Sequence, residues 1–212
     1  MKKILLFAAV LFTAGQASAQ ISIAPEAGIQ MTDLRMSSSD SSLGDFGYKT
    51  GFRAGVNFAA ELNDFSIHAG AFYTTKGAKS ESFGVKLTIN MTYIDIPVYV
   101  NYNILNKSGN KLFVGVGPYL SYCMSGKIKA KGSFLGQSID QSEDLNIGSS
   151  ATDQIRSLDF GGNANIGFIS AMGLYARASY SLGFANIANN DASEGTIKTT
   201  GFALSVGYQV KL

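Results

Sequence analysis

The sequence predicts an all-β fold, an eight-stranded antiparallel up-and-down transmembrane β-barrel, and three observations support this prediction. In the last segment, 197–212, every second residue from Phe202 onward is apolar or aromatic, and the residues between are small or polar. A period of two places these two sets on opposite faces of a strand. The segment also has the ~9–11 residues that a tilted strand needs to cross a bilayer, more than the ~5–6 of an ordinary strand. Beyond the N-terminal region there is no apolar run long enough for a spanning helix, and a closed barrel is then the remaining way to satisfy backbone groups in lipid.

The N-terminus has the pattern of a secretory signal peptide. Lys2 and Lys3 precede an apolar run over 4–14, and Ala17-Ser18-Ala19 offers a small-residue cleavage site. The apolar run is shorter than the ~18 residues of a spanning helix. We therefore expect two parts, a signal peptide over 1–19 and an outer-membrane β-barrel domain over 20–212.

Composition narrows the functional classes. The chain has 17 basic and 15 acidic side chains, and removal of Lys2 and Lys3 would balance the two signs. No concentrated basic face of the kind that nucleic acid requires is evident, so no nucleic-acid partner is expected. Cys123 and His68 are the only residues of their kinds in the sequence, which argues against an internal disulfide and against a metal site built from clustered Cys and His. No cofactor is expected.

The alternation continues along the chain in eight segments, which are 21–31, 48–62, 65–74, about 86–104, 111–123, 158–168, 174–184 and 197–212. Longer polar stretches, expected as loops, cover 32–47, 76–85, 124–155 and 186–195. Short turns are expected near 63–64, 106–110 and 171–173. Long and short connections alternate strictly, which is typical of an outer-membrane meander with both termini in the periplasm and the long loops outside. Within the longest loop Lys127, Lys129 and Lys131 alternate, which favours a hairpin that continues beyond the membrane.

Outward-facing aromatic residues fall at two heights if successive strands run in opposite directions. The outer set is Phe52, Tyr73, Tyr122, Phe160, Phe184 and Phe202, and the inner set is Phe65, Tyr102, Phe168 and Tyr208. Two aromatic belts that frame aliphatic residues are favoured at lipid–water interfaces.

All three prolines of the sequence, Pro25, Pro97 and Pro118, fall inside predicted strands. A closed barrel has no free edge where a missing N–H is harmless. We therefore expect a bulge or bend at each proline, and a bulge would invert the inward and outward faces beyond it.

Charged side chains on the small, polar face are the candidate site. They are Glu26, Arg53, Glu61, Asp95, Asp159 and Arg177, with His68 and Lys111 beside them. Eight strands enclose room for little more than side chains, so these groups should pair with one another. Strand direction places Arg53 at a height near that of Asp95 or Asp159 and brings Arg177 within reach of Glu26. Two functions fit this set, a polar plug that stiffens the barrel, which is favoured, and a gated ion or proton path.

Catalysis is not expected. His68 is the one candidate general base, and its alternation places it inside the barrel with only Ser66 next along its face. Cys123 has no evident activating neighbour in the sequence. No catalytic, metal-binding or cofactor-binding residue is therefore assigned.

Two segments of the predicted strands carry distinctive motifs. They are Y-I-D-I-P-V-Y-V-N-Y at 93–102, which contains Asp95 and Pro97, and V-G-V-G-P-Y-L-S-Y at 114–122, which contains Gly117-Pro118-Tyr119. In these motifs the chain resembles the PorT-like outer-membrane β-barrel family of the Bacteroidota. The resemblance implies an eight-stranded outer-membrane barrel without a defined activity, and the family's namesake is tied to a gliding-associated protein secretion system. The C-terminus departs from the common pattern, because the last residue is Leu212 where barrel proteins often end in an aromatic residue.

The expected function is that of a non-enzymatic protein of the cell outer membrane, whose loops 32–47 and 124–155 contact a partner or the envelope. The expected partners are outer-membrane lipid, the barrel assembly machinery and an envelope or secretion-system protein, and the expected state is a monomer. One alternative is a narrow, porin-like channel or a membrane component of a secretion system. A second is a soluble periplasmic lipocalin-like barrel, in which the apolar face would line a ligand cavity.

Overall fold

A computed structural model describes residues 20–37, 47–82, 84–134, 137–148, 153–189 and 195–212, and the predicted signal peptide lies outside them. The strands are β1 (Gln20–Ser37), β2 (Gly47–Leu62), β3 (Phe65–Ser82), β4 (Val85–Lys107), β5 (Asn110–Phe134), β6 (Gln137–Asp144), β7 (Leu158–Ile169), β8 (Leu174–Gly183), β9 (Thr196–Tyr208) and β10 (Val210–Lys211). Among the described residues, no helix is long and apolar enough to cross a membrane.

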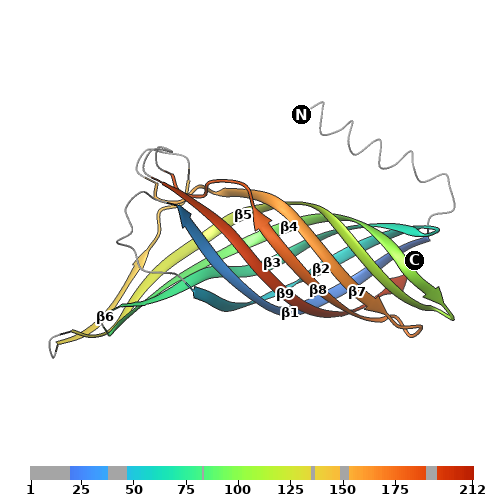
Figure 1. Cartoon of the computed structure of the whole chain (residues 1–212), viewed down its shortest axis with the longest axis horizontal. Coiled ribbons are helices and arrows are strands. Elements are labelled where there is room, and N and C mark those ends of the chain that lie inside the picture. Colours follow the sequence, from blue (N-terminus) through green and yellow to red (C-terminus); the bar gives the residue numbers. More distant parts are fainter. Residues whose placement is uncertain (1–19, 38–46, 83, 135–136, 149–152, 190–194) are drawn as a thin grey trace.

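The sheet closes on itself through its first and last long strands. Neighbours follow the order β1-β2-β3-β4-β5-β7-β8-β9, and β9 pairs back with β1 from Glu26 opposite Gly207 to Ser37 opposite Thr196. The strands run obliquely along the long axis of the molecule (Figure 1). This ring confirms the predicted eight-stranded antiparallel barrel. β6 stands outside the ring and pairs with β5 alone.

The two ends of the barrel differ. The short turns after β2, β4 and β7 lie at the end that carries the C-terminus, which we call the turn end, and β6 projects from the opposite end, which we call the loop end (Figure 1). At the turn end, the backbone N–H of Ala171 donates to Oδ1 of Asn110 at 3.0 Å, and the N–H of Gln209 donates to the carbonyl of Gly173 at 2.7 Å. The turns therefore hold one another as well as their own strands.

Large apolar side chains face outward and polar side chains face inward. On β9, Leu204 and Val206 are 59% and 62% exposed, while Ser205 between them is buried. The same alternation holds on the other strands of the ring, as the inward burial of Asn57, Ser121 and Asn165 illustrates. The alternative of a soluble lipocalin-like barrel requires the opposite arrangement and is therefore wrong.

Outward aromatic side chains gather at two levels, as the alternation predicts. Toward the loop end, the rings of Phe52 and Tyr73 lie 5.8 Å apart, and those of Tyr180 and Phe202 lie 4.7 Å apart. Toward the turn end, Phe65 and Tyr102 lie 5.3 Å apart. Aromatic rings at these two levels are suited to the two interfaces of a bilayer.

The strands at the loop end are longer than predicted. β4 has 23 residues and β5 has 25, more than twice the ~9–11 that a bilayer requires. The predicted loop over 76–85 is wrong for most of its length, because β3 continues to Ser82 and β4 begins at Val85. Part of the predicted loop over 32–47 is also strand, since β1 continues to Ser37.

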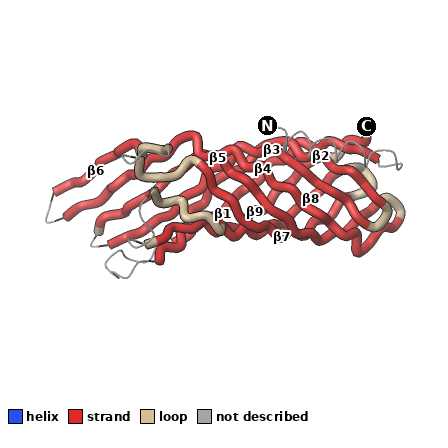
Figure 2. The backbone as a smooth tube through the Cα atoms, turned by 90° about the horizontal axis from the view of Figure 1, so that it is seen from above, coloured by secondary structure: helices blue, strands red, loops and turns tan. Residues whose placement is uncertain are grey.

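The hairpin predicted from the lysine alternation in the longest loop is confirmed. β5 continues through Lys127, Lys129 and Lys131 and turns back as β6, with Lys127 opposite Asp144 and Lys131 opposite Asp140. Figure 2 shows this sheet fanning away from the closed part of the barrel.

The predicted bulges at the prolines are wrong. Partner positions keep one register across Pro118, and also on either side of Pro25 and Pro97, where the pairing is interrupted without a shift. A proline lacks the N–H that would donate to the neighbouring strand, and the two strands can lose that one hydrogen bond without changing their register. The register shifts lie elsewhere, between Tyr48 and Arg53 and at two places along β4. The inward and outward faces predicted around the prolines therefore hold.

Candidate functional site

The candidate site is the interior of the barrel, where charged side chains from seven strands meet. All six predicted residues point inward, and Glu26, Arg53, Asp159 and Arg177 are buried. Four acidic and four basic side chains form ion pairs there, and they are Glu26, Glu61, Asp95, Asp159, Arg53, Lys76, Lys111 and Arg177. They fall into three groups along the barrel axis.

The first group is centred on Glu26 of β1. Nη1 of Arg177 lies 3.4 Å from Oε2 of Glu26, and Nη2 of Arg53 lies 3.9 Å from Oε1. The hydroxyl of Tyr175 donates to the same Oε2 atom. The guanidinium of Arg53 also stacks over the ring of Phe72 at 4.1 Å. One buried carboxylate thus holds two guanidinium groups from β2 and β8, strands that are not neighbours in the sheet.

His68 extends this group. Its Nδ1 atom lies 3.0 Å from Nη2 of Arg177, and its Nε2 atom lies 3.1 Å from Oγ of Ser66. A guanidinium is always a donor, so Nδ1 accepts and the proton of the neutral ring is on Nε2, from where it is donated to Ser66. The imidazole is buried in the barrel interior, where it lies between Arg177 and Ser66.

The second group is centred on Lys76 of β3. Its Nζ atom lies 2.9 Å from Oδ1 of Asp95 and 3.9 Å from Oδ2 of Asp159, and donates to Oγ of Ser121 at 2.9 Å. Thr199 donates to Oδ2 of Asp159 at 2.8 Å. The lysine lies between two carboxylates and reduces the repulsion between them.

A further ion pair lies toward the turn end. Nζ of Lys111 is 3.0 Å from Oε2 of Glu61, and both side chains are more than four-fifths buried. Beside it, Ala24, Phe113, Ile169 and Tyr175 form a small apolar cluster. These side chains occupy the lumen toward this end.

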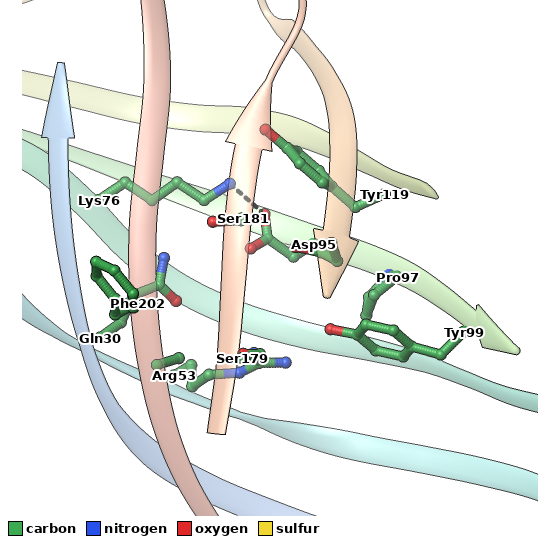
Figure 3. A pocket seen from close by; sticks show the side chains of 12 residues that line it. Gln30, Arg53, Lys76, Asp95, Pro97, Tyr99, Tyr119, Ser179, Ser181 and Phe202 are labelled. Carbon is green, nitrogen blue, oxygen red and sulfur yellow. Dashed lines mark ion pairs between the residues drawn. The ribbon is translucent and has the colours of Figure 1, made fainter. Parts of the chain in front are cut away.

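A small polar cavity separates the first two groups. Figure 3 shows Lys76 and Asp95 on one side of it and Arg53 and Tyr99 on the other. The space open to the centre of a water molecule is about 20 Å³, enough for about one water. Several buried polar atoms of both groups have no protein hydrogen-bond partner, including Oε1 of Glu26 and Nε of Arg53. The site is thus suited to hold bound water.

An apolar cluster covers the lumen toward the loop end. It consists of Leu34, Ala78, Met91, Tyr93, Cys123, Ile155 and Ile187. Ile155 and Ile187 come from the connections after β6 and β8, which fold over the barrel and bond to each other where the N–H of Arg156 donates to the carbonyl of Ile187 at 2.8 Å. Cys123 lies in this apolar cluster. In the described part of the chain, no group of His, Cys, Asp and Glu side chains could hold a metal ion.

Arg177 reaches Glu26, as strand direction predicts. Arg53 lines the same small cavity as Asp95, but its ion pair is with Glu26. Asp95 and Asp159 pair instead with Lys76, which lies in strand β3 and not in the predicted loop over 76–85. The sequence does contain a signal that assigns Lys76 to the strand, because Phe72, Thr74 and Lys76 continue one inward-facing alternation.

Comparison with known proteins agrees with this architecture. Residues 14–189 match the family model described as outer membrane protein beta-barrel domain. The outer membrane protein OprG from Pseudomonas aeruginosa superimposes with a TM-score of 0.51 at 10% identity, covering 92% of this chain and 97% of OprG. This similarity shows the fold alone.

Two further solved structures are similar at lower scores. Ail, the attachment invasion locus protein of Yersinia pestis, has a TM-score of 0.49 at 16% identity over 90% of this chain and 99% of Ail. Neisserial surface protein A has a TM-score of 0.43 at 16% identity over 90% and 97%. A search of curated protein sequences finds no match. From the family match over most of its length, this chain belongs to the outer membrane protein beta-barrel domain family.

Proposed function

We propose that this outer-membrane protein is a non-enzymatic surface barrel with a plugged lumen, and that its extended hairpin at the loop end contacts a partner in the envelope or outside the cell. The observation that carries the proposal is the sheet of β3, β4, β5 and β6, which continues well beyond the loop-end aromatic level. Strands that served only to span the bilayer would not need this length.

The outward face of this extension is ordered in cross-strand rows. One row joins Glu81, Lys86, Lys131 and Asp140, and its charges balance. The next row joins Lys79, Thr88, Lys129 and Ser142, and contains two lysines without an acid. Directly opposed residues share one face of a sheet, so the extension presents a local positive charge. This favours an acidic partner.

The plugged lumen supports a structural role for the buried charges. Side-chain layers follow one another from the apolar cluster at the loop end to the Lys111–Glu61 pair at the turn end. Paired charges in a closed interior fix the strands at defined distances, and removing one partner is costly. We assign Glu26, Arg53, Glu61, Asp95, Asp159 and Arg177 to this stiffening network.

The absence of enzymatic activity is part of the proposal. His68 is buried and bonded to Arg177 and Ser66, and a general base must reach a substrate. Cys123 is buried among apolar side chains, where a thiolate is disfavoured. We further propose that the protein is a monomer in outer-membrane lipid, inserted by the barrel assembly machinery.

Site-specific photo-crosslinking in intact envelopes tests the hairpin. A crosslinker at Lys129 should capture a defined adduct, and a crosslinker at the lipid-facing Leu204 should not capture it. The charge-reversing Lys79→Glu variant should reduce the adduct several-fold, and the balanced-row variant Lys86→Gln should reduce it much less. Equal capture from both crosslinker positions, or no dependence on Lys79, would contradict the proposal.

A second candidate function is a narrow channel or a membrane component of a secretion system. The polar cavity between Arg53 and Lys76 favours the channel, and the resemblance of 93–102 and 114–122 to PorT-like proteins favours the secretion role. Conductance steps in planar bilayers that vanish in Arg53→Ala or Asp95→Ala would support the channel. A stable complex with other envelope proteins that survives loss of the hairpin contact would support the secretion role.

A further inference from the structure

A groove on the lipid-facing wall lies at the loop end, where β7 begins and β8 ends. Its volume is about 670 Å³, and its lining includes Leu120, Leu158, Phe160 and Phe184, together with the polar side chains of Arg156 and Asn186. It lies on the outer side of the barrel, separate from the polar cavity in the lumen. The plugged-barrel proposal makes no use of it.

The floor of the groove is formed by apolar side chains from neighbouring segments. Phe160 is directly opposite Leu120 on β5, and its carbonyl accepts the backbone N–H groups of Phe184 at 2.9 Å and Ala185 at 3.2 Å. The side chains of Leu120, Leu158, Phe160 and Phe184 are each about half exposed. Phe160 and Phe184 belong to the aromatic level toward the loop end, so the floor lies where acyl chains meet the headgroup region.

Among the described residues that line the groove, Arg156 is the one cation. It lies two residues before Leu158, where β7 begins. Its own N–H is fixed to the carbonyl of Ile187 at 2.8 Å. Its side chain is exposed and makes no hydrogen bond or ion pair with the described residues. The backbone of Arg156 is thus fixed beside the apolar floor, and its exposed side chain can pair with an anion bound in the groove.

The rim beside Arg156 is also fixed. Oδ1 of Asn186 accepts the backbone N–H groups of Ala188 at 3.1 Å and Ile197 at 2.8 Å. These bonds hold the connection after β8 against β9. Arg156 and Asn186 thus both line the groove, and hydrogen bonds fix the chain at each of them.

From this arrangement we propose that the groove binds one phosphorylated lipid of the outer leaflet, with a phosphate on Arg156 and an acyl chain along Leu158, Phe160 and Phe184. A guanidinium recognises phosphate by paired hydrogen bonds. A small soluble anion would leave the apolar floor uncovered, and a lipid without phosphate would leave the cation without a partner. An anionic lipid can both pair with the guanidinium and cover the apolar floor.

Native mass spectrometry of the full-length protein in neutral detergent tests the site, with bis-phosphorylated lipid A as the probe. The wild type should retain one lipid A molecule, and Arg156→Ala should lower the retained fraction about fivefold. Arg35→Ala is the matched control, because Arg35 is exposed on β1 outside the groove and its loss should change retention little. The dephosphorylated lipid should be retained as weakly by the wild type as lipid A is by Arg156→Ala.

The floor is tested separately. Phe184 lies just past the end of β8, so Phe184→Ser should leave the barrel folded, which an unchanged heat-shifted gel band would verify. This variant should also lose lipid A retention. The proposal is overturned if Arg156→Ala and Arg35→Ala retain lipid A equally, or if Phe184→Ser retains it like the wild type.

Discussion

Glu26 and Arg177 form an ion pair across the lumen from two strands that are not neighbours, with Oε2 and Nη1 3.4 Å apart. β1 carries the carboxylate, β8 carries the guanidinium, and β9 lies between them in the sheet. Backbone ladders join only neighbouring strands. Contacts of this kind therefore constrain the cross-section of the barrel in a way that the ladders cannot.

Replacement of Glu26 should be strongly destabilising. Glu26→Ala leaves Arg53 and Arg177 close together in the interior without a counter-charge, and breaking a buried pair costs about 3–5 kcal/mol. Urea titration of the refolded protein, followed by the heat-shifted gel band, measures the free energy of unfolding. Glu81→Ala removes an exposed carboxylate on the loop-end extension and should change this free energy by less than about 0.5 kcal/mol. Similar effects of the two variants would refute the role given to Glu26.

Lys76 and Asp95 should be energetically coupled. Lys76→Met leaves two carboxylates facing each other, and the addition of Asp95→Asn removes part of that repulsion. A double-mutant cycle on the free energy of unfolding should therefore give a coupling of about 1–3 kcal/mol.

The exposed pair Lys127 and Asp144 provides the control for this cycle. Their charged atoms are 3.1 Å apart, close to the Lys76–Asp95 distance, but their side chains are 56% and 75% exposed. The same substitutions there should give a coupling of about 0–1 kcal/mol, because solvent screens exposed pairs. A coupling of this size for Lys76 and Asp95 would contradict the role of burial.

The strand count and the two faces of the wall could be predicted because period-two alternation is local. The faces of residues such as Leu204 and Ser205 can be assigned from one segment alone. Membrane strands need this contrast between apolar and polar faces along their whole length. The end of a strand beyond the membrane leaves a weaker signal. Both faces meet water there, so the polar run around Lys76 resembles a loop even though it continues the strand.

Ion-pair partners could not be predicted in full, because they depend on the stagger between strands. Arg53 lies closer to Glu26 than to Asp95 as a result of registers that are set across the whole ring. Register shifts without proline or glycine at the site leave little mark in the sequence, as between Thr92 and Tyr93. The prolines are visible in the sequence, but the strands accommodate them without a register shift.

Gly28 should be required for closure of the barrel. A Cβ atom at this position would lie 2.1 Å from the carbonyl oxygen of Leu204 and 2.6 Å from Cα of Ser205 on β9. Gly28→Val should therefore separate β1 from β9 and abolish the heat-shifted band after refolding into lipid. Ala27→Val, at the adjacent exposed and lipid-facing position, should keep the band. A normal band for Gly28→Val would show that β1 and β9 approach less closely.

The register shift on β4 and β5 predicts a sharp change in thiol accessibility over two residues. Tyr93 is opposite Cys123, whereas Thr92 is opposite Ser125, so Met124 is the extra residue on β5. Cys123 is buried in the apolar cluster, and Met124 and Ser125 are both exposed.

In folded protein the Cys123 thiol should react with a water-soluble maleimide at least about tenfold more slowly than after unfolding. In a Cys123→Ser background, Ser125→Cys should react rapidly in the folded state and, if the loop end faces outward, in intact cells. Rapid labelling of Cys123 in the folded wild type would show that the apolar cluster does not seal the lumen, and slow labelling of Ser125→Cys in purified folded protein would place the register shift elsewhere.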